Sequence, residues 1–354
     1  MSASQHQKDS GMALILTLMA VSFLVAVTVR LSTSVNRQMI SAANQSTTVR
    51  LDAMLLSGLH IARAALLADQ QQEDNTSDTP LDTWGTLDSA LLSELFPGTL
   101  DVTVTDLSGR LQANALVWTE KEKKAWKKKQ KSKNKKKDPE KLQRSLWKRF
   151  LSLEDLGLEA MDEEQVDIML DSLVDWLDSD DEQEENGAER GYYSGLDPSY
   201  VPSNGPLQLI EDLVLVKGWD QKILYTGLKK RENASSNLID YLTCGEQPGK
   251  VNINTAPALV LQALHGEMTE EIAADLISFR ESEENKDTLK EITWYRNVPG
   301  FPSTISFDQI LITTESNFFK ITLTATENGL KRTGEGIVQR KKNQEQVLLY
   351  WKIQ

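Results

Sequence analysis

The sequence is poor in the side chains that bind transition metals and form disulfides. It has one cysteine and three histidines among 354 residues. Cys244 cannot form a disulfide within the chain, and His6, His60 and His265 lie far apart in the sequence. These absences exclude a disulfide-stapled fold and a zinc or iron–sulfur site built from cysteines.

Catalytic motifs are absent as well. The sequence has no P-loop, no His-Glu-x-x-His, no Gly-x-Ser-x-Gly and no nucleophile with a base close to it in sequence. We therefore predict no catalytic residues and a protein that is not an enzyme.

Glycine and proline are scarce, with 19 and 10 residues, which excludes a collagen-like or low-complexity protein. Eight tryptophans and 40% hydrophobic residues supply enough apolar surface for a core. The length suggests two or three domains. A formal net charge of -13 argues against a surface that binds nucleic acid throughout, although it leaves room for a local basic patch.

The longest hydrophobic run covers residues 12–29 and ends at Arg30. As a helix it would span about 27 Å, enough for the hydrocarbon core of a bilayer. Signal peptides and signal anchors both begin in this way. No small-x-small cleavage site follows, and the first proline is Pro80, so we expect one helix that continues to residue 68. A 3.6-residue spacing gives its second half an apolar stripe of Val35, Met39, Ala42, Val49, Ala53, Leu56 and His60.

The polar leader of residues 1–11 ends in Gly11-Met12, directly at the start of this run. It resembles the leader of type IV pilins and type II secretion pseudopilins, which the prepilin peptidase cuts after the glycine before it methylates the new amine. The resemblance implies that Met12 is the first mature residue and Leu16 the fifth. Most such proteins have Glu at the fifth position, where a carboxylate in the bilayer needs a partner. Leu16 departs from that pattern, as the minor pseudopilin K class does.

Two segments after the helix predict strands. Residues 100–105 alternate between apolar and polar side chains, and residues 111–116 follow a turn. A basic run then covers residues 121–137, with 11 Lys and Glu122 as its one acid. We expect it to be disordered or a frayed helix. An insertion in a surface loop is the favoured interpretation, and a tether to anionic headgroups, an acidic partner or nucleic acid is the alternative.

Residues 151–189 reverse the charge. They contain 16 acidic residues and no Lys or Arg, yet their apolar residues keep a helical spacing. We therefore expect a folded acidic helical region. Its end packs carboxylates so densely that a hard divalent cation would relieve their repulsion.

The spacing of Asp178, Asp180, Glu182 and Glu189 is similar to that of an EF-hand. Gln183 stands where an EF-hand needs glycine, so we reject that motif. From charge alone, a different calcium loop and a solvated acidic face both stay open.

Residues 251–256, Val-Asn-Ile-Asn-Thr-Ala, resemble the opening of helix-hairpin-helix modules, which bind DNA phosphates through backbone amides. Helices are predicted at 259–264 and 272–280, the first capped by Thr255 with Pro257 in its first turn. The connecting hairpin has three Glu and no Lys or Arg, so it would repel phosphate.

Three further strands are predicted at residues 316–325, 333–340 and 346–351. With residues 100–116 they would complete one antiparallel sheet, which the helical region interrupts in sequence.

Several motifs resemble, in the same order, those of the type II secretion minor pseudopilin K family. They are Asp-x-x-Gly-Arg-Leu at 106–111, Asp-Trp-Leu-Asp at 175–178, Tyr-Tyr at 192–193, Ser-Asn-Gly-Pro-Leu at 203–207, Val-Asn-Ile-Asn-Thr-Ala-Pro at 251–257 and Asn-Phe-Phe-Lys-Ile at 317–321.

The resemblance implies a calcium ion (Ca2+) in a periplasmic domain. It implies Asp178, Asp180 and Glu189 as the principal metal ligands, with Asp181 and Glu182 as additional ones. The acid that usually follows Glu189 is Arg190 here. The resemblance also implies that Asn252 and Asn254 are buried structural caps, beside Thr255 in the same motif.

The expected fold class is α+β, with a long N-terminal transmembrane helix and a split pilin-like α/β domain. A large all-α domain, similar to sterile-alpha-motif and helix-hairpin-helix folds, would be inserted into it. The expected boundaries are a leader at 1–11, the helix at 12–68, the first part of the pilin-like domain at 69–116, a Lys-rich insertion at 117–150, the helical domain with the acidic loop at 151–300 and the completing strands at 301–354.

The implied function is that of a minor pseudopilin at the tip of the type II secretion pseudopilus. Such a protein initiates assembly and helps to export folded proteins across the outer membrane. It would cross the inner membrane once, keep its C-terminal body in the periplasm, and meet pseudopilins I and J, the prepilin peptidase and secreted proteins, but no nucleic acid. A membrane-anchored helix-hairpin-helix DNA-binding protein is the first alternative. An exported enzyme with an acid/base pair in the acidic loop is the second.

Overall fold

The computed structural model describes residues 3–72, 76–129, 138–156, 161–225, 237–245, 249–341 and 343–354. The α-helices are α1 (Ala3–Gln70), α2 (Ser89–Ser93), α3 (Glu120–Lys129), α4 (Pro139–Leu151), α5 (Glu163–Leu177), α6 (Arg190–Ser194), α7 (Gln221–Tyr225), α8 (Ala258–Ala263) and α9 (Glu270–Arg280). The 3-10 helices are η1 (Ala113–Leu116), η2 (Glu154–Leu156), η3 (Ile210–Leu215), η4 (Leu238–Tyr241), η5 (Glu283–Lys290) and η6 (Trp294–Asn297). The strands are β1 (Thr99–Asp106), β2 (Leu111–Gln112), β3 (Leu242–Thr243), β4 (Val251–Asn252), β5 (Ile312–Thr313), β6 (Phe318–Glu327), β7 (Leu330–Arg340) and β8 (Gln346–Ile353).

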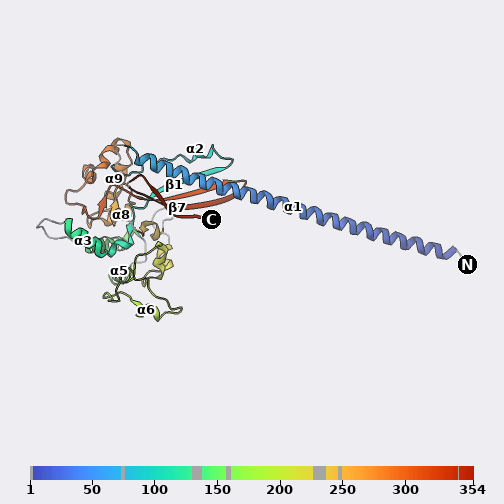
Figure 1. Cartoon of the computed structure of the whole chain (residues 1–354), viewed down its shortest axis with the longest axis horizontal. Helices are drawn as coiled ribbons and strands as arrows, with labels where there is room; N and C mark the ends of the chain where they lie inside the picture. Colours follow the sequence, from blue (N-terminus) through green and yellow to red (C-terminus); the bar gives the residue numbers. More distant parts are fainter. Residues whose placement is uncertain are drawn as a thin grey trace.

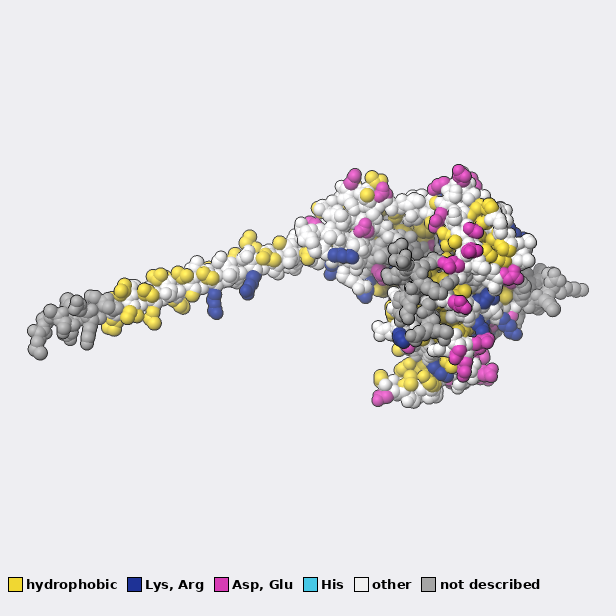
Figure 2. Space-filling view, turned by 180° about the vertical axis from the view of Figure 1, so that it is seen from behind, with side chains coloured by type: hydrophobic (Ala, Val, Ile, Leu, Met, Phe, Trp, Pro, Cys, Tyr) yellow, Lys and Arg dark blue, Asp and Glu magenta, His cyan; other side chains and the backbone are white. Residues whose placement is uncertain are grey.

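The first half of α1 projects from the body, with the N-terminus at one extreme of the molecule (Figure 1). By length and composition, α1 is long and apolar enough to cross a membrane. Hydrophobic side chains line this projecting part, and the side chains of residues 12–29 are exposed (Figure 2). The hydroxyls of Thr17 and Thr28 donate to the carbonyls of Leu14 and Leu24, which satisfies two polar groups inside the apolar run.

A four-stranded antiparallel sheet has the order β1-β6-β7-β8. Its register pairs Leu100 with Ala325 and Val102 with Leu323, so that the buried side chains of β1 and β6 share one face. The predicted strands at 100–105 and in the C-terminal part of the chain are therefore confirmed. They are brought together although more than 200 residues separate β1 from β6 in the sequence.

The second half of α1 covers one face of this sheet (Figure 1). The sheet-facing residues are Leu51, Met54, Leu55, Leu59, Ala62 and Leu66, all buried. Gly58 allows the close approach, since a Cβ there would lie 2.4 Å from Leu323 Cδ2. The apolar stripe predicted from Val35 to His60 is instead exposed to solvent. α1 carries apolar residues on more than one face, and spacing alone does not say which of these faces meets the sheet.

A second hydrophobic cluster forms between β1 and β6 in the sequence. Leu146, Trp147 and Phe150 of α4 lie at its centre and are fully buried. The prediction that residues 117–150 are an insertion is therefore wrong for α4, whose apolar face belongs to the core. Residues 111–116, expected with the sheet, also contribute to this cluster.

This second unit is mostly helical but not all-α. Two short parallel pairings, β2 with β3 and β4 with β5, lie within it or connect it to the strand region. The expected all-α insertion is corrected accordingly. Each pairing joins two segments of two residues that lie far apart in the sequence, and segments this short show no periodic pattern from which they could be predicted.

The basic run is helical where the structure describes it. Helix α3 covers its first part, and residues 130–137 lie outside the described residues. Of the two predicted states, disorder or a frayed helix, residues 121–129 thus adopt the helix.

A buried polar junction connects the two hydrophobic clusters. The side-chain amide of Asn252 donates to the carboxylate of Asp106 (3.0 Å) and to the hydroxyl of Ser316 (2.9 Å). Arg340 donates to the Asp78 carboxylate and to the Ser316 carbonyl, the latter at 2.8 Å. These side chains come from the ends of β1, β4 and β7 and from two connecting segments, so they fix how the two units meet.

Asn252 and Asn254 are both fully buried. Asn254 donates to the carbonyl of Leu289 (3.1 Å), and the Asn252 side chain accepts from the Asn254 backbone N–H (3.0 Å). Thr255 is not the cap of α8, because a turn from Asn252 to Ala256 delays the helix and Pro257 precedes its first residue. The Thr255 hydroxyl donates instead to Asp106, at 2.5 Å.

Candidate metal centre

Helix α5 supplies the base of the acidic site. Asp162 begins it by accepting from the Gln165 backbone N–H at 2.8 Å, and two glutamates in its first turn complement the helix dipole. Its apolar face, including Met169 and Leu173, is fully buried. The helix ends at Leu177 and Asp178 is its C-cap, so the chain leaves the core at the first of the predicted ligands.

Two further carboxylates of α5 hold the loop that follows. Asp171 accepts from the backbone N–H of Asn186 (3.1 Å), and Asp175 accepts from that of Glu184 (3.0 Å). The ammonium of Lys217 donates to the carbonyls of Asn186 (3.1 Å) and Gly187 (2.9 Å). These bonds fold residues 178–189 back onto the helix.

A second segment fastens the loop from outside. Asn204 has φ 40°, in the left-handed region, and donates to the Asp180 carbonyl at 2.8 Å. The backbone N–H of Gly205 donates to the carbonyl of Trp176 at 3.1 Å. Trp176 itself packs edge-on against Tyr193, with ring centroids 5.3 Å apart, and both side chains are buried. The Ser-Asn-Gly motif thus fixes the position of this loop through hydrogen bonds.

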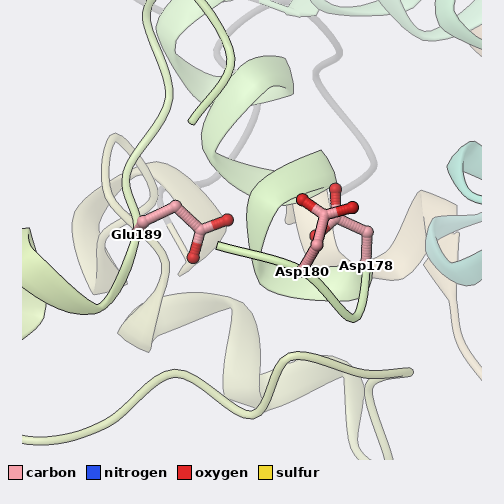
Figure 3. Close-up of side chains that lie close together, drawn as sticks. All are labelled: Asp178, Asp180 and Glu189. Carbon is pink, nitrogen blue, oxygen red and sulfur yellow. The ribbon is translucent and has the colours of Figure 1, made fainter. Parts of the chain in front are cut away.

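Three carboxylates lie close together in this folded loop. One oxygen each from Asp178, Asp180 and Glu189 lies within 4.8 Å of the others. The Glu189 carboxylate points across the loop toward the other two (Figure 3). Glu189 is only 6% exposed, and neither of its oxygens has a hydrogen-bond partner. Asp178 Oδ1 is buried without a partner as well.

Burial and mutual repulsion make these acids hard to ionise. Burial first, and then the charges of Asp175, Asp178 and Asp181, raise the pKa of Glu189 to about 7. Burial followed by repulsion from Asp180 and Asp175 raises the pKa of Asp178 to about 6. A cation among these carboxylates would offset both the cost of burying their charges and their mutual repulsion.

The donor set fits a hard divalent cation. All donors are carboxylate oxygens, the ligands that Ca2+ prefers, and buried carboxylates without hydrogen bonds are costly unless an ion compensates them. Calcium takes six to eight oxygens, so three carboxylates leave room for backbone carbonyls and water.

The structure does not bring all five predicted ligands together. Asp181 instead accepts from the Asn204 side chain at 3.3 Å, and Glu182 is exposed on the loop. Neither belongs to the cluster of three. Two further residues at this loop were not predicted from the sequence: Asn204, whose Oδ1 is buried without a hydrogen-bond partner, and Asp175, whose Oδ2 is in the same state. The Ser-Asn-Gly motif was the one signal that could have pointed to Asn204.

Two sequence models of the type II secretion system protein K family match the chain, at residues 109–229 and 251–315. Together they cover slightly more than half of it. The chain belongs to the type II secretion system protein K family. The first match contains α5 and the whole acidic loop, and the second contains β4, α8 and α9.

Known proteins agree with this assignment. Type II secretion system protein K of Pseudomonas aeruginosa strain PAO1 is 28% identical over 263 residues, which are 72% of this chain and 68% of that protein. The crystal structure of the GspK-GspI-GspJ complex from enterotoxigenic Escherichia coli contains a similar fold. It has a TM-score of 0.56 and 16% identity, and covers 88% of this chain and 99% of that one.

As a protein K, the chain is a minor pseudopilin of type II secretion and a structural subunit rather than an enzyme. Helices α8 and α9, which suggested a DNA-binding hairpin, lie inside the second family match. Glu270 and Glu271 begin α9 where a phosphate would have to bind. The hairpin is therefore a part of the protein K fold.

Proposed function

We propose that this protein K stands at the tip of the pseudopilus, where it starts assembly with pseudopilins I and J and helps folded proteins to cross the outer membrane. The observation that carries the proposal is the family match over the body, joined to an N-terminal helix that can span a membrane. The similar GspK comes from a complex with GspI and GspJ, which supports the same partners here.

We place the apolar part of α1 in the inner membrane and the body in the periplasm, as a single-pass protein. The prepilin peptidase would cut after Gly11 and methylate the amine of Met12. Leu16 brings no charge into the bilayer, so this subunit needs no neighbour to neutralise it.

The exposed stripe of α1 supports packing against other subunits. Val35, Met39 and Val49 are 45%, 67% and 64% exposed. They lie on the part of the helix beyond the apolar run, on the side away from the sheet. An apolar stripe of this kind is covered when helices pack side by side.

In this proposal the sheet with the second half of α1 is a pilin-like domain, and the second hydrophobic cluster is an inserted domain of sterile-alpha-motif type. Residues 111–116 and 139–150 are assigned to this inserted domain, and the other domain boundaries predicted from the sequence are kept. The buried junction of Asp106, Asn252 and Ser316 would transmit load between the two units.

We further propose that Asp178, Asp180 and Glu189 hold calcium. The ion would supply positive charge that fixes the loop of residues 178–189 against α5. The buried, unpartnered oxygens of Asp178 and Glu189 support this assignment.

The test is co-purification. The full chain is expressed with tagged pseudopilins I and J, extracted from membranes and captured on the tag. We expect a complex of all three. A matched variant with Val35→Glu and Met39→Glu on the exposed stripe should lose the complex, whereas Lys331→Glu on β7 should keep it. Capture of neither partner by the unmodified chain would contradict the tip role.

A further inference from the structure

Helix α3 presents a row of lysines that the tip role does not use. Lys121, Lys124 and Lys128 are exposed. At 100° per residue they fall within about 60° of one another, so they form one face, here called the lysine face. None of the three forms an ion pair with a described residue.

The opposite side of α3 is fastened to the body. Lys123 pairs with Glu140 at 3.2 Å, and the same carboxylate accepts from the backbone N–H of Trp118 at 2.8 Å. Trp126 packs edge-on against Trp118, with ring centroids 5.9 Å apart. These contacts fix which side of the helix faces outward.

The helix also begins with a capping box. The Glu122 carboxylate accepts from the Thr119 backbone N–H at 2.8 Å, and the Thr119 hydroxyl accepts from the Glu122 N–H at 3.3 Å. A solvated charge run needs neither a cap nor an anchor. Like charges three and four residues apart destabilise a helix, so the cap and the anchoring contacts must stabilise α3 against the repulsion among these lysines.

The position of α3 excludes the inner membrane as its partner. Figure 1 shows α3 at the end of the molecule opposite the N-terminus. The part of α1 between residues 30 and 70 alone is about 60 Å long as a helix, and charges are screened over about 8 Å at physiological salt. An interfacial membrane helix also needs an apolar face, whereas Trp126 lies on the anchored side.

We propose that the lysine face of α3 is a docking surface for an acidic surface of another protein. Charge complementarity selects this partner, because an anionic protein surface relieves the lysine repulsion without requiring an apolar contact. The inference rests on the proposed function in one respect only, the periplasmic location of the body. In that compartment α3 is separated from nucleic acid.

The experiment uses the full chain in detergent with calcium and measures its binding to fluorescein-labelled poly-L-glutamate by anisotropy. We expect binding that weakens steeply with salt. The triple variant Lys121→Gln, Lys124→Gln, Lys128→Gln should bind about tenfold more weakly, since three exposed charge pairs are lost. The corresponding triple Arg variant should bind as the unmodified chain does.

The matched control removes the same charge elsewhere, with Lys141→Gln, Lys331→Gln and Lys352→Gln, all exposed in the structure. Equal weakening by this control would show a net-charge effect and overturn the proposal. Tighter binding to vesicles with 30% phosphatidylglycerol or to duplex DNA, lost in the lysine-face triple, would also overturn it.

Capture of pseudopilins I and J is measured on the same preparations. If they are not captured, the tip role fails while the poly-L-glutamate result still decides the lysine face. If they are captured but poly-L-glutamate does not bind, the lysine-face proposal alone fails.

Discussion

The side-chain amide of Asn252 lies 3.0 Å from the carboxylate of Asp106, across 146 residues of sequence. Asp106 ends β1 at the edge of the sheet, and Asn252 belongs to β4 of the helical unit. Both are buried, so this bond is made away from water. The two hydrophobic clusters of the body are therefore joined by directed hydrogen bonds rather than by apolar contact alone, which fixes their relative orientation.

Replacing Asn252 should be among the most destabilising single changes in the body. Asn252→Ala leaves Asp106, Ser316 and the Asp78 carbonyl without their shared donor, so we expect a loss of about 3 kcal/mol in the free energy of unfolding. Denaturant unfolding of the detergent-solubilised chain, followed by tryptophan fluorescence, measures it.

Asn254→Ala is the control for this prediction. Asn254 is equally buried but donates one side-chain hydrogen bond, to Leu289, so about 1 kcal/mol is expected. Equal losses in the free energy of unfolding of both variants would contradict the special importance of the hydrogen bonds that Asn252 makes at the junction.

The junction should also make stability depend on pH. Burial, opposed by Arg340 and reinforced by Asp106, raises the pKa of Asp78 from 3.8 to about 7. Between these values the folded chain holds a proton that the unfolded chain releases, so the contribution of Asp78 to stability is greatest at low pH and is lost as pH rises through this window. One such group contributes a slope of up to about 1.4 kcal/mol per pH unit.

Denaturant unfolding between pH 5 and pH 8, in chelator throughout, measures this slope. Asp78→Asn should reduce the slope to the part that Glu189 and Asp178 contribute, whereas Asp52→Asn, in a partly exposed ion pair on α1, should leave it unchanged. A slope that is the same in all three proteins would refute the assignment to Asp78.

The three clustered carboxylates should show opposite effects with and without calcium. Glu189→Gln and Asp178→Asn should weaken calcium binding about 100-fold or more. Mutating even a group that only hydrogen-bonds to a metal ligand weakens metal affinity by about 10- to 100-fold. In chelator, Glu189→Gln should instead stabilise the chain by about 1 to 2 kcal/mol, because it removes a buried charge whose pKa is about 7. Isothermal calorimetry and denaturant unfolding give the two numbers.

Glu185→Gln is the matched control, since Glu185 is an exposed acid of the same loop outside the cluster. It should alter neither number measurably. Calcium affinity that falls equally in the control would show that the loop attracts the ion by general charge.

Gly187 should be essential for the loop because of its closeness to Asp175. A Cβ at this position would lie 1.9 Å from Asp175 Oδ2. Gly187→Ala must displace either the loop or the Asp175 carboxylate that holds it, so we expect a loss of about 2 to 3 kcal/mol and calcium binding weakened about tenfold. The control Gly191→Ala meets no atom within 4 Å and should be neutral. Both variants are compared by thermal unfolding with and without calcium.

Processing of the N-terminus is the most direct prediction about the membrane segment. Mass spectrometry of the chain from purified membranes should show a mature protein that begins at N-methylated Met12. Gly11→Val should retain the leader, whereas Ser10→Ala should be processed normally. An intact Met1 in the unmodified chain, or a cut beyond Val29, would remove the pseudopilin mechanism.

The local features of this protein could be predicted from the sequence because each depends on neighbours along the chain. The apolar run of residues 12–29, the alternation at 100–105 and the acidic helix end at Asp178 carry their own periodicity or charge. The motifs around them are specific enough to indicate the protein K family by themselves.

The tertiary structure decided what depends on distant partners. It selected the face of α1 that meets the sheet, and it joined Asp178 and Asp180 to Glu189 while leaving Asp181 and Glu182 outside. It also gave Asn252 its partners Asp106 and Ser316. Spacing in sequence fixes which side chains share a face of one element, but the packing of elements far apart in sequence decides what that face meets.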